Sequence, residues 1–266
     1  MFTVDPSGGL CNRLRVLDSA IALAKAIDKP LHLIWRKNNR LNELNCNFSS
    51  LFIIPSVIKK LSEPYTPHIV KKIIKKLHLY QLKYQKTYFQ KDVESLLKIN
   101  YNFENFRNSR SIYISTLSKF YRNPHPFFDL VPKPEITTIV NDIVRGFDFN
   151  TIGVHIRRAD NLRSKSVSTI KKFEARMNLE MTLNPTVNFF LATDDLNVET
   201  FFRGRFKNKI IVYPKREIKR SIPLAIEDAL IDLLCLSKTK KILGSYWSSF
   251  TETASQINNV DLFVVK

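Results

Sequence analysis

Arginines, carboxylates and serines gather where three apolar segments of this sequence end. Guanidinium groups bind phosphate oxygens in pairs, and hydroxyl groups and helix N-termini supply further donors to an anion. These residue types therefore predict a polar site for a phosphate-bearing ligand. The residues are Arg157, Arg158 and Asp160 at the first segment, Asp194 and Asp195 at the second, and Ser248 and Ser249 at the third.

The three apolar segments are predicted strands of one α/β sheet. Regular alternation of strand-like runs and helically spaced apolar residues is typical of a doubly wound parallel sheet. Ligands of such sheets bind beyond the carboxyl ends of the strands, so we expect the polar residues to meet at one edge. The expected strands are 151–157, 187–193, 209–213, 240–244 and 261–265, and the expected helices are 135–146, 169–181, 196–206, 224–237 and 249–257.

Each polar residue also has a purely structural interpretation. Asp194 is a candidate N-cap of the following helix, and the serine pair is a candidate cap of the last helix. Adjacent strand residues point to opposite faces, so we expect one arginine of the pair, Arg157, to face the ligand. His155 lies inside a strand, where a histidine is more often packed than catalytic. No third ligand stands at a suitable spacing from Asp194 and Asp195, so we expect no metal.

A glycine loop organises the first 35 residues. The chain has six glycines, and two of them, Gly8 and Gly9, stand together in this loop. The loop lacks the full dinucleotide fingerprint and is weak evidence alone. Strand, glycine loop, helix and strand in this order predict a Rossmann-like sheet, with the strand at 2–4, the helix at 13–27 and the second strand at 31–35.

The composition indicates a globular protein of one or two domains. With 266 residues, 44% hydrophobic and 25% charged, the chain is not mainly disordered. No apolar run reaches the ~18–20 residues of a membrane span, and the first residues show no signal-peptide pattern. The 3 well-separated cysteines argue against a disulfide framework or a zinc site. We therefore expect a reduced, cytoplasmic protein.

Four prolines between residues 123 and 134 mark the best linker in the sequence. We place the domain boundary there. Residues 1–125 are then an N-terminal Rossmann-like domain, and residues 126–266 are a C-terminal one.

The net charge of +18 calls for an anionic partner such as nucleic acid, a membrane surface or nucleotide phosphates. Residues 56–91 hold nine lysines and one glutamate, a local charge of +8. We interpret residues 55–91 as a basic helical insertion, broken at Pro64 and Pro67. Two interpretations of this stretch are open: a solvated surface helix, or a helix that rests on anionic lipid.

Five segments, in order along the chain, resemble the motifs of the fucosyltransferase superfamily. This superfamily includes the N-glycan-core alpha-1,6 enzymes, the rhizobial nodulation fucosyltransferases and the protein O-fucosyltransferases. The resemblance touches the first 35 residues and most of 150–257, and it leaves 45–130 unmatched. The segments are GGLCNRL at 8–14, HIRRADN at 155–161, FLATDD at 190–195, DALIDLL at 228–234 and GSYWSSF at 244–250.

The resemblance implies a GT-B-like α/β fold, two Rossmann-like domains facing a cleft. It implies a metal-independent, inverting glycosyltransferase that uses a GDP-sugar, most often GDP-fucose. It assigns the donor pyrophosphate to Arg157, guanine recognition to Asp232, and phosphate contacts to Ser248 and Ser249. The other residues it places at the donor site are Gly8, Gly9, Asn12, Arg13, His155, Arg158, Asp160, Asp194 and Asp195.

Two positions depart from the pattern of the superfamily. Cys11 stands where a glycine is usual and adds a side chain beside the loop. Lys165 stands where the core alpha-1,6 enzymes have a candidate catalytic glutamate, so the general base is unassigned.

We expect the C-terminal domain to bind the donor and residues 1–125 to bind a glycan acceptor. The expected setting is polysaccharide biosynthesis in the cytoplasm, with residues 56–91 suited to the inner face of a membrane. One alternative is the same fold acting on another nucleotide sugar. The other is a basic nucleic-acid-binding protein, which would leave the polar residues at the strand ends unexplained.

Overall fold

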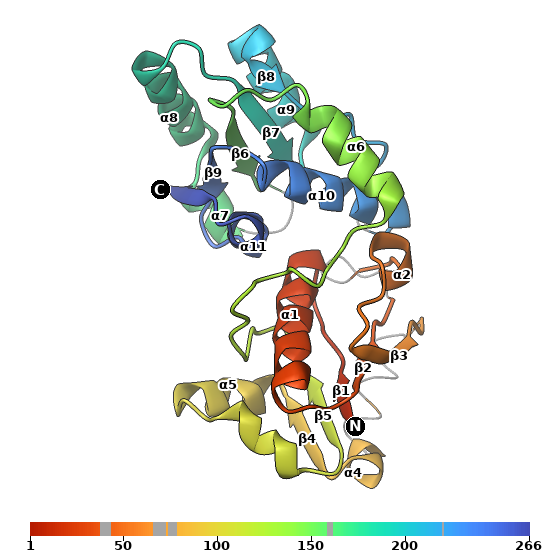
Figure 1. Ribbon diagram of the computed structural model, residues 1–266. Helices are drawn as coiled ribbons and strands as arrows, with labels where there is room; N and C mark the ends of the chain where they lie inside the picture. The colour runs from red at the N-terminus through yellow and green to blue at the C-terminus, as the bar shows by residue number, and fades with distance from the viewer. Residues whose placement is uncertain (38–43, 66–72, 74–78, 159–161, 220) are drawn as a thin grey trace. The chain divides into compact units, whose positions relative to one another are not determined.

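The computed structural model describes residues 1–37, 44–65, 73, 79–158, 162–219 and 221–266. The chain divides into two compact units (Figure 1). The first unit is Met1–Lys133 together with Lys219–Ile226, and the second unit is Pro134–Ile218 together with Glu227–Lys266. The division after Lys133 falls inside the proline-rich segment, and a short later segment belongs with the first unit.

A parallel sheet of five strands forms the centre of the first unit, in the order β3-β2-β1-β5-β4. The predicted strand, helix and strand at the start of the chain are present, and α1 is buried along most of its length. The elements are β1 (Phe2–Val4), α1 (Leu10–Ala26), β2 (Leu31–Ile34), α2 (Phe48–Leu51), β3 (Ile58–Ser62), α4 (Leu79–Lys83), β4 (Lys86–Phe89), α5 (Gln90–Lys98), η1 (Phe103–Asn108) and β5 (Ile112–Ser115).

The prediction of a helical insertion over residues 55–91 is wrong at both ends of the stretch, which supply the two edge strands of the first sheet. Between them, α4 is helical. β3 pairs with β2 on one side, and β4 pairs with β5 on the other. Lys59 and Lys60 on β3 are exposed. Lysines on an edge strand hinder its pairing with another sheet, so these charges protect the β3 edge. The amphipathic helix expected near 68–79 lies mostly outside the described residues.

The second unit has its own parallel sheet, in the order β10-β9-β6-β7-β8. The direction in which strands are added reverses at β6, so the switch point lies between β6 and β9. The elements are α6 (Pro134–Val144), β6 (Ile152–Ile156), α7 (Leu162–Val167), α8 (Ile170–Leu183), β7 (Phe189–Thr193), α9 (Leu196–Phe206), η2 (Lys207–Lys209), β8 (Ile210–Ile211), α10 (Pro223–Leu236), β9 (Lys241–Ser245), α11 (Ser249–Ile257) and β10 (Asp261–Val265).

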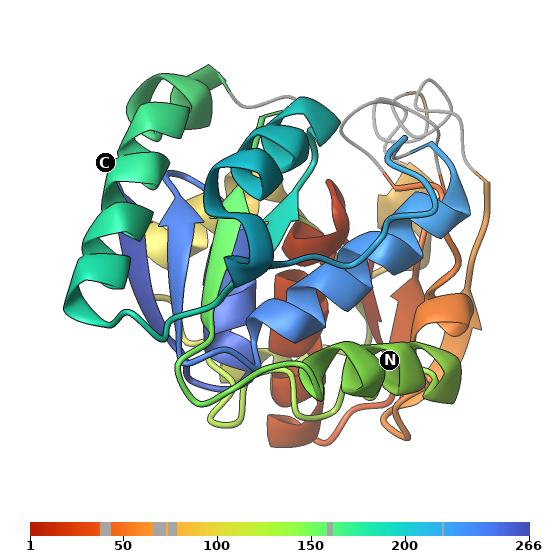
Figure 2. The same ribbon diagram turned by 90° about the horizontal axis from the view of Figure 1, so that it is seen from above.

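Alternate residues of β6 pack against different helices. Ile152, Val154 and Ile156 belong to one core cluster with side chains of α8 and α9. Gly153 and His155 point the other way, toward α10 and α11. Helices therefore flank this sheet on both sides (Figure 2). Covering both faces is what an all-parallel sheet requires, because its strands are apolar on both sides.

The predicted pair of Rossmann-like α/β domains is confirmed by the two sheets. The expectation that they face a cleft, with donor and acceptor divided between them, remains a prediction.

Candidate functional site

Ser245, the last residue of β9, fixes the end of β6. Its buried Oγ accepts a hydrogen bond from the Arg157 N–H over 3.0 Å and donates one to the His155 carbonyl oxygen over 3.1 Å. One hydroxyl can donate and accept at the same time, so it ties both ends of this short backbone segment. The half-buried Arg157 therefore leaves the carboxyl edge of the sheet from a fixed backbone position.

Arg158 is committed to the chain itself. Its backbone N–H donates to Oδ1 of Asp194 over 2.6 Å. Its guanidinium donates to the carbonyl oxygens of Lys165, over 3.2 Å, and Ser168, over 2.6 Å. Burial lowers the pKa of this guanidinium, and Asp194 and Asp195 act in the opposite direction. Arg158 thus braces the end of α7 and the residue after it. The expectation that Arg157 points the opposite way remains a prediction.

Asp194 and Asp195, which follow β7, make different hydrogen bonds, and the capping residue is not the one proposed from the sequence. Asp195 is the N-cap of α9, and its side chain accepts from the Asn197 N–H over 2.9 Å. Asp194, the residue expected as the cap, instead accepts from Arg158. Both carboxylates are half-buried at the carboxyl end of the strand.

The N-terminus of α11 carries an N-cap serine that does not cap the helix. Ser248 is its N-cap residue, yet its side chain makes no capping hydrogen bond. Ser248 is 2% exposed, and its Oγ has no hydrogen-bond partner among the described residues. Ser249 is the first helical residue and is half-buried. A buried hydroxyl without a partner beside free helical N–H groups suits a phosphate oxygen.

His155 is packed, as its position inside a strand suggested. Its Nδ1 lies 2.7 Å from Thr251 Oγ1, and its ring stacks on Phe250 at 4.6 Å between centroids. Gly244 on the neighbouring strand makes this approach feasible, because a Cβ there would collide with the Thr251 side chain. His155 therefore positions α11 relative to the sheet.

Asp232 on α10 forms a buried ion pair with Lys215. Lys215 Nζ lies 3.0 Å from Oδ2 of Asp232, and the two side chains are 8% and 5% exposed. Burial raises the pKa of Asp232 to about 6, and Lys215 offsets this effect in part. Oδ1 of Asp232 is buried and has no hydrogen-bond partner within the described part of the chain. A buried acceptor that lacks a partner is a candidate to accept from a ligand N–H.

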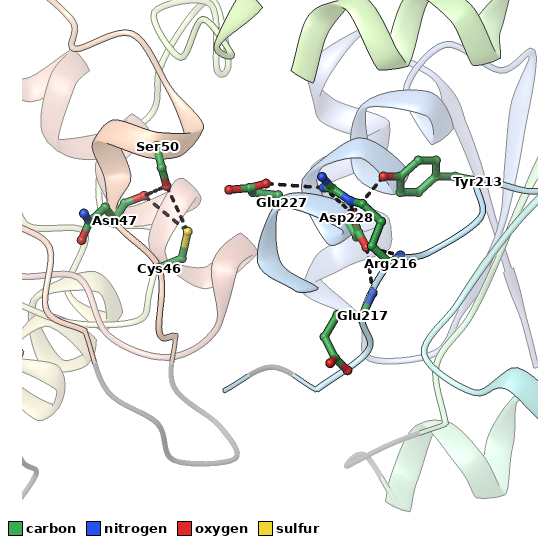
Figure 3. A network of polar contacts seen from close by, with 8 residues as sticks. All are labelled: Cys46, Asn47, Ser50, Tyr213, Arg216, Glu217, Glu227 and Asp228. Atoms are coloured by element: carbon green, nitrogen blue, oxygen red, sulfur yellow. Dashed lines mark hydrogen bonds and ion pairs between the residues drawn. The ribbon is translucent and has the colours of Figure 1, made fainter. Parts of the chain in front are cut away.

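A network around Asp228 holds the segment that carries Lys215 (Figure 3). Asp228 is fully buried and accepts from the Tyr213 hydroxyl at 2.9 Å and the Arg216 Nε at 2.8 Å. It also accepts from the backbone N–H groups of Arg216, at 2.7 Å, and Glu217, at 3.1 Å. The segment after β8 is thereby fastened to α10, one turn before Asp232.

The glycine loop of the first unit is fixed from behind by Arg13. Gly8 has φ +84°, a left-handed conformation that favours glycine. Arg13 is 1% exposed and donates from Nε to the Gly8 carbonyl oxygen over 2.7 Å and from Nη1 to the Arg36 carbonyl oxygen over 2.5 Å. Its guanidinium also lies over the Trp35 ring, 5.3 Å from the centroid. Arg13 supports the loop from inside the core.

Two other loop residues stand at the start of α1. Gly9 is the N-cap residue of this helix, and Asn12 Oδ1 accepts from Arg15 Nη2 over 2.9 Å. Cys11, which replaces the usual glycine, is 4% exposed on α1, so its side chain packs into the core.

Asp160 lies outside the described residues. Among those that are described, no group of three or more His, Cys, Asp or Glu side chains could hold a metal ion. The absence of a metal requirement stays a prediction.

Lys215 and the carboxylate network around Asp228 are features that the sequence reasoning missed. Lys215 follows the carboxyl end of β8, so the rule that selected the other strand ends would have selected it as well. The expected strand at 209–213 is present as the shorter β8 (Ile210–Ile211), but the residues after it were not included among the candidates.

No protein-family model and no curated protein matches this chain. Solved structures do. NodZ alpha-1,6-fucosyltransferase soaked with GDP-fucose is 17% identical with a TM-score of 0.65, covering 96% of this chain and 92% of its own. NodZ is a Bradyrhizobium fucosyltransferase in a further structure. POFUT1 in complex with GDP-fucose is 11% identical with a TM-score of 0.60, covering 98% of each chain.

A mutant of Arabidopsis thaliana FUT1 in complex with GDP is 13% identical with a TM-score of 0.59, covering 98% of this chain and 69% of its own. The chain therefore has the two-domain, GT-B-like fold of these fucosyltransferase structures, and the resemblance carried by the motifs is confirmed at the level of the fold.

Proposed function

We propose that this chain is an inverting fucosyltransferase that moves fucose from GDP-fucose to a glycan or glycoconjugate acceptor. The observation that carries the proposal is the buried hydroxyl of Ser248, which has no partner among the described residues and lies at the N-terminus of α11, on the same sheet edge as Arg157. The structures with the same fold that are named for GDP-fucose or GDP complexes support this donor.

In the proposed reaction the acceptor oxygen forms a bond to the anomeric carbon while the bond from that carbon to the β-phosphate oxygen breaks. GDP leaves with the electron pair, and a general base takes the proton of the acceptor hydroxyl. Negative charge grows on the β-phosphate, so the Arg157 guanidinium and the donors at Ser248 and Ser249 stabilise the transition state more than the ground state. The base remains unassigned.

Asp232 is the proposed reader of guanine. Its buried Oδ1 can accept from a base N–H, and Asp228 fixes the segment that places Lys215 on the other oxygen. Replacing Asp232 by Asn presents an amide donor toward the donors of guanine. Asp232→Asn should therefore weaken the binding of GDP by about 2–3 kcal/mol and the binding of UDP much less.

The remaining donor-site residues take supporting roles in this proposal. Arg158, Arg13 and His155 hold backbone and helices in place through the contacts described above. Gly8, Gly9 and Asn12 shape the loop at the start of α1, and Asp194 and Asp195 line the edge behind β7. Asp160 stays a candidate donor contact from the sequence.

The donor is assigned to the second unit and the acceptor to residues 1–125. We also infer a role in polysaccharide biosynthesis in the cytoplasm. No helix in the described ranges is long and apolar enough to cross a membrane. Contact with the inner membrane face through the lysines of 56–91 is proposed on their charge, worth about 1 kcal/mol per basic residue near anionic lipid.

A ligand panel tests the assignment. Binding of GDP, UDP, CMP and a random oligonucleotide is measured at two salt concentrations, followed by transfer assays with GDP-fucose. Tight, salt-insensitive GDP binding with fucosyl transfer is the expected result. Preference for UDP or CMP indicates another nucleotide sugar, and oligonucleotide binding that falls steeply with salt indicates a nucleic-acid-binding protein.

A further inference from the structure

Trp247 stands on the sheet edge of the second unit as a largely exposed aromatic side chain. It is 58% exposed and lies between Tyr246 and the buried Ser248, in the loop that joins β9 to α11. The other tryptophan of the chain, Trp35, is 0% exposed in the first unit. Tryptophan combines a large apolar face with a polar N–H and is enriched at binding interfaces.

The backbone at Trp247 is held in an unfavourable conformation. Its φ is +52°, in the left-handed region that is unfavourable for a bulky residue. The preceding residue is fastened: the Tyr246 N–H donates to Ser168 Oγ over 2.8 Å, and Ser168 Oγ donates to the Val265 carbonyl oxygen over 2.5 Å. Ser168 is the same residue whose carbonyl oxygen accepts from Arg158. Strain of this kind persists where surrounding contacts fix it, and it clusters at functional sites.

Arg163 on α7 holds the indole ring. Its guanidinium carbon lies 4.4 Å from the centroid of the Trp247 ring, within the range of a cation–π contact. Arg163 is itself exposed, so its N–H groups can still donate to a ligand that lies beside the ring. The guanidinium thus covers one face of the indole ring, and Trp247 remains 58% exposed, in a pair built from two elements, α7 and the β9–α11 loop.

We propose that Trp247 and Arg163 form a platform for a pyranose ring. One face of a pyranose carries C–H groups that pack on an aromatic ring, and its hydroxyl groups accept from guanidinium donors. This inference rests on the proposed function, since the phosphate contacts are assigned to the next residues in the chain. The sugar is the fucosyl group of the donor or the sugar of the acceptor.

The two tryptophans allow a direct measurement without turnover. Binding of GDP and of GDP-fucose is followed by calorimetry and, in parallel, by tryptophan emission. We expect GDP-fucose to change the emission more than GDP if the platform holds the donor sugar. If it holds the acceptor, the emission changes on addition of an acceptor oligosaccharide in the presence of GDP. In Trp247→Phe the change disappears while Trp35 still emits.

Trp247→Gly gives the kinetic test, because glycine removes the ring and relieves the positive φ. We expect unchanged or higher thermal stability, unchanged GDP affinity and about tenfold lower kcat/KM, the scale of one desolvated cation–π-type contact. Phe149→Gly is the matched control, because Phe149 is 84% exposed near the opposite end of the same sheet. It should leave transfer unchanged.

The outcomes separate the two proposals. GDP-fucose binding by calorimetry with no emission change from donor or acceptor, and native transfer by Trp247→Gly, would overturn the platform and leave the proposed function standing. No binding of GDP or GDP-fucose to the native chain would overturn both.

Discussion

The ammonium group of Lys215 lies 3.0 Å from the Asp232 carboxylate inside the second unit, and both side chains are almost fully buried. A buried ion pair offsets the desolvation of its two charges only when both partners are present. This pair also leaves one carboxylate oxygen, Oδ1, without a partner in the part of the chain that the structure describes. The fold therefore depends on both partners of the pair, and Oδ1 of Asp232 is a candidate hydrogen-bond acceptor.

Removing Lys215 alone should be strongly destabilising. Lys215→Met leaves a buried carboxylate without its counter-ion, and we expect a loss of about 3–5 kcal/mol in the free energy of unfolding. The double variant Lys215→Met/Asp232→Leu should recover most of that loss. Urea denaturation measures both, with the exposed Lys238→Met as control. A loss below about 1 kcal/mol for Lys215→Met would show that the pair is not buried in solution.

The raised pKa of Asp232 predicts a specific pH dependence. Its carboxyl titrates near 6 in the folded protein, above the ordinary value of 3.8, so the folded state binds this proton more readily than the unfolded state. The contribution of Asp232 to stability is therefore greatest below about pH 4 and is lost as the pH rises through about 6, by about 3 kcal/mol in total. The free energy of unfolding, measured by denaturation at several pH values between 4 and 7, should change less with pH for Asp232→Asn than for the native protein. The same dependence of the unfolding free energy on pH in both proteins would contradict the prediction.

The two adjacent arginines should separate catalysis from stability. Arg157→Lys keeps the charge and loses the planar fork, so we expect turnover to fall at least ~10²-fold with an unchanged thermal midpoint. Arg158→Lys cannot reach the carbonyl oxygens of both Lys165 and Ser168, and it should cost about 1.5–3 kcal/mol of unfolding free energy. Transfer assays and thermal melts on both variants give the comparison. Near-native transfer by Arg157→Lys would remove the centre of the donor-site proposal.

Ser248 should behave unlike an ordinary N-cap residue. Alanine at an N-cap usually costs about 0.5–2 kcal/mol, but the Ser248 hydroxyl makes no capping bond, so Ser248→Ala should cost nothing in stability. The same substitution should lower the affinity for GDP about tenfold, because it removes a hydrogen bond to phosphate. Asp195→Ala is the matched comparison, because that side chain does cap α9 and its loss should cost about 1 kcal/mol. Equal stability losses for both variants would place Ser248 among ordinary caps.

Much of the second unit is determined by the sequence itself. The expected helices at 196–206 and 249–257 and the strand at 261–265 coincide with α9, α11 and β10. The reason is local: strong apolar periodicity and short polar turns fix these elements, and parallel strands bring their carboxyl ends to one edge. The position of Arg157 at that edge followed from the same pattern.

Only the tertiary structure decided two features. One is which side chains pair at the carboxyl ends of the strands in the second sheet, and the other is which segments form the edge strands of the first sheet. Asp195 and not Asp194 caps α9, Arg158 turns back to two carbonyl oxygens, and Lys215 meets Asp232 from a different segment. Residues 58–62 and 86–89 became strands although their lysines suggested helical surface. Each of these outcomes depends on which distant segment packs alongside, and pairing with β2 or β5 outweighs the weak local preference of a short, charged run.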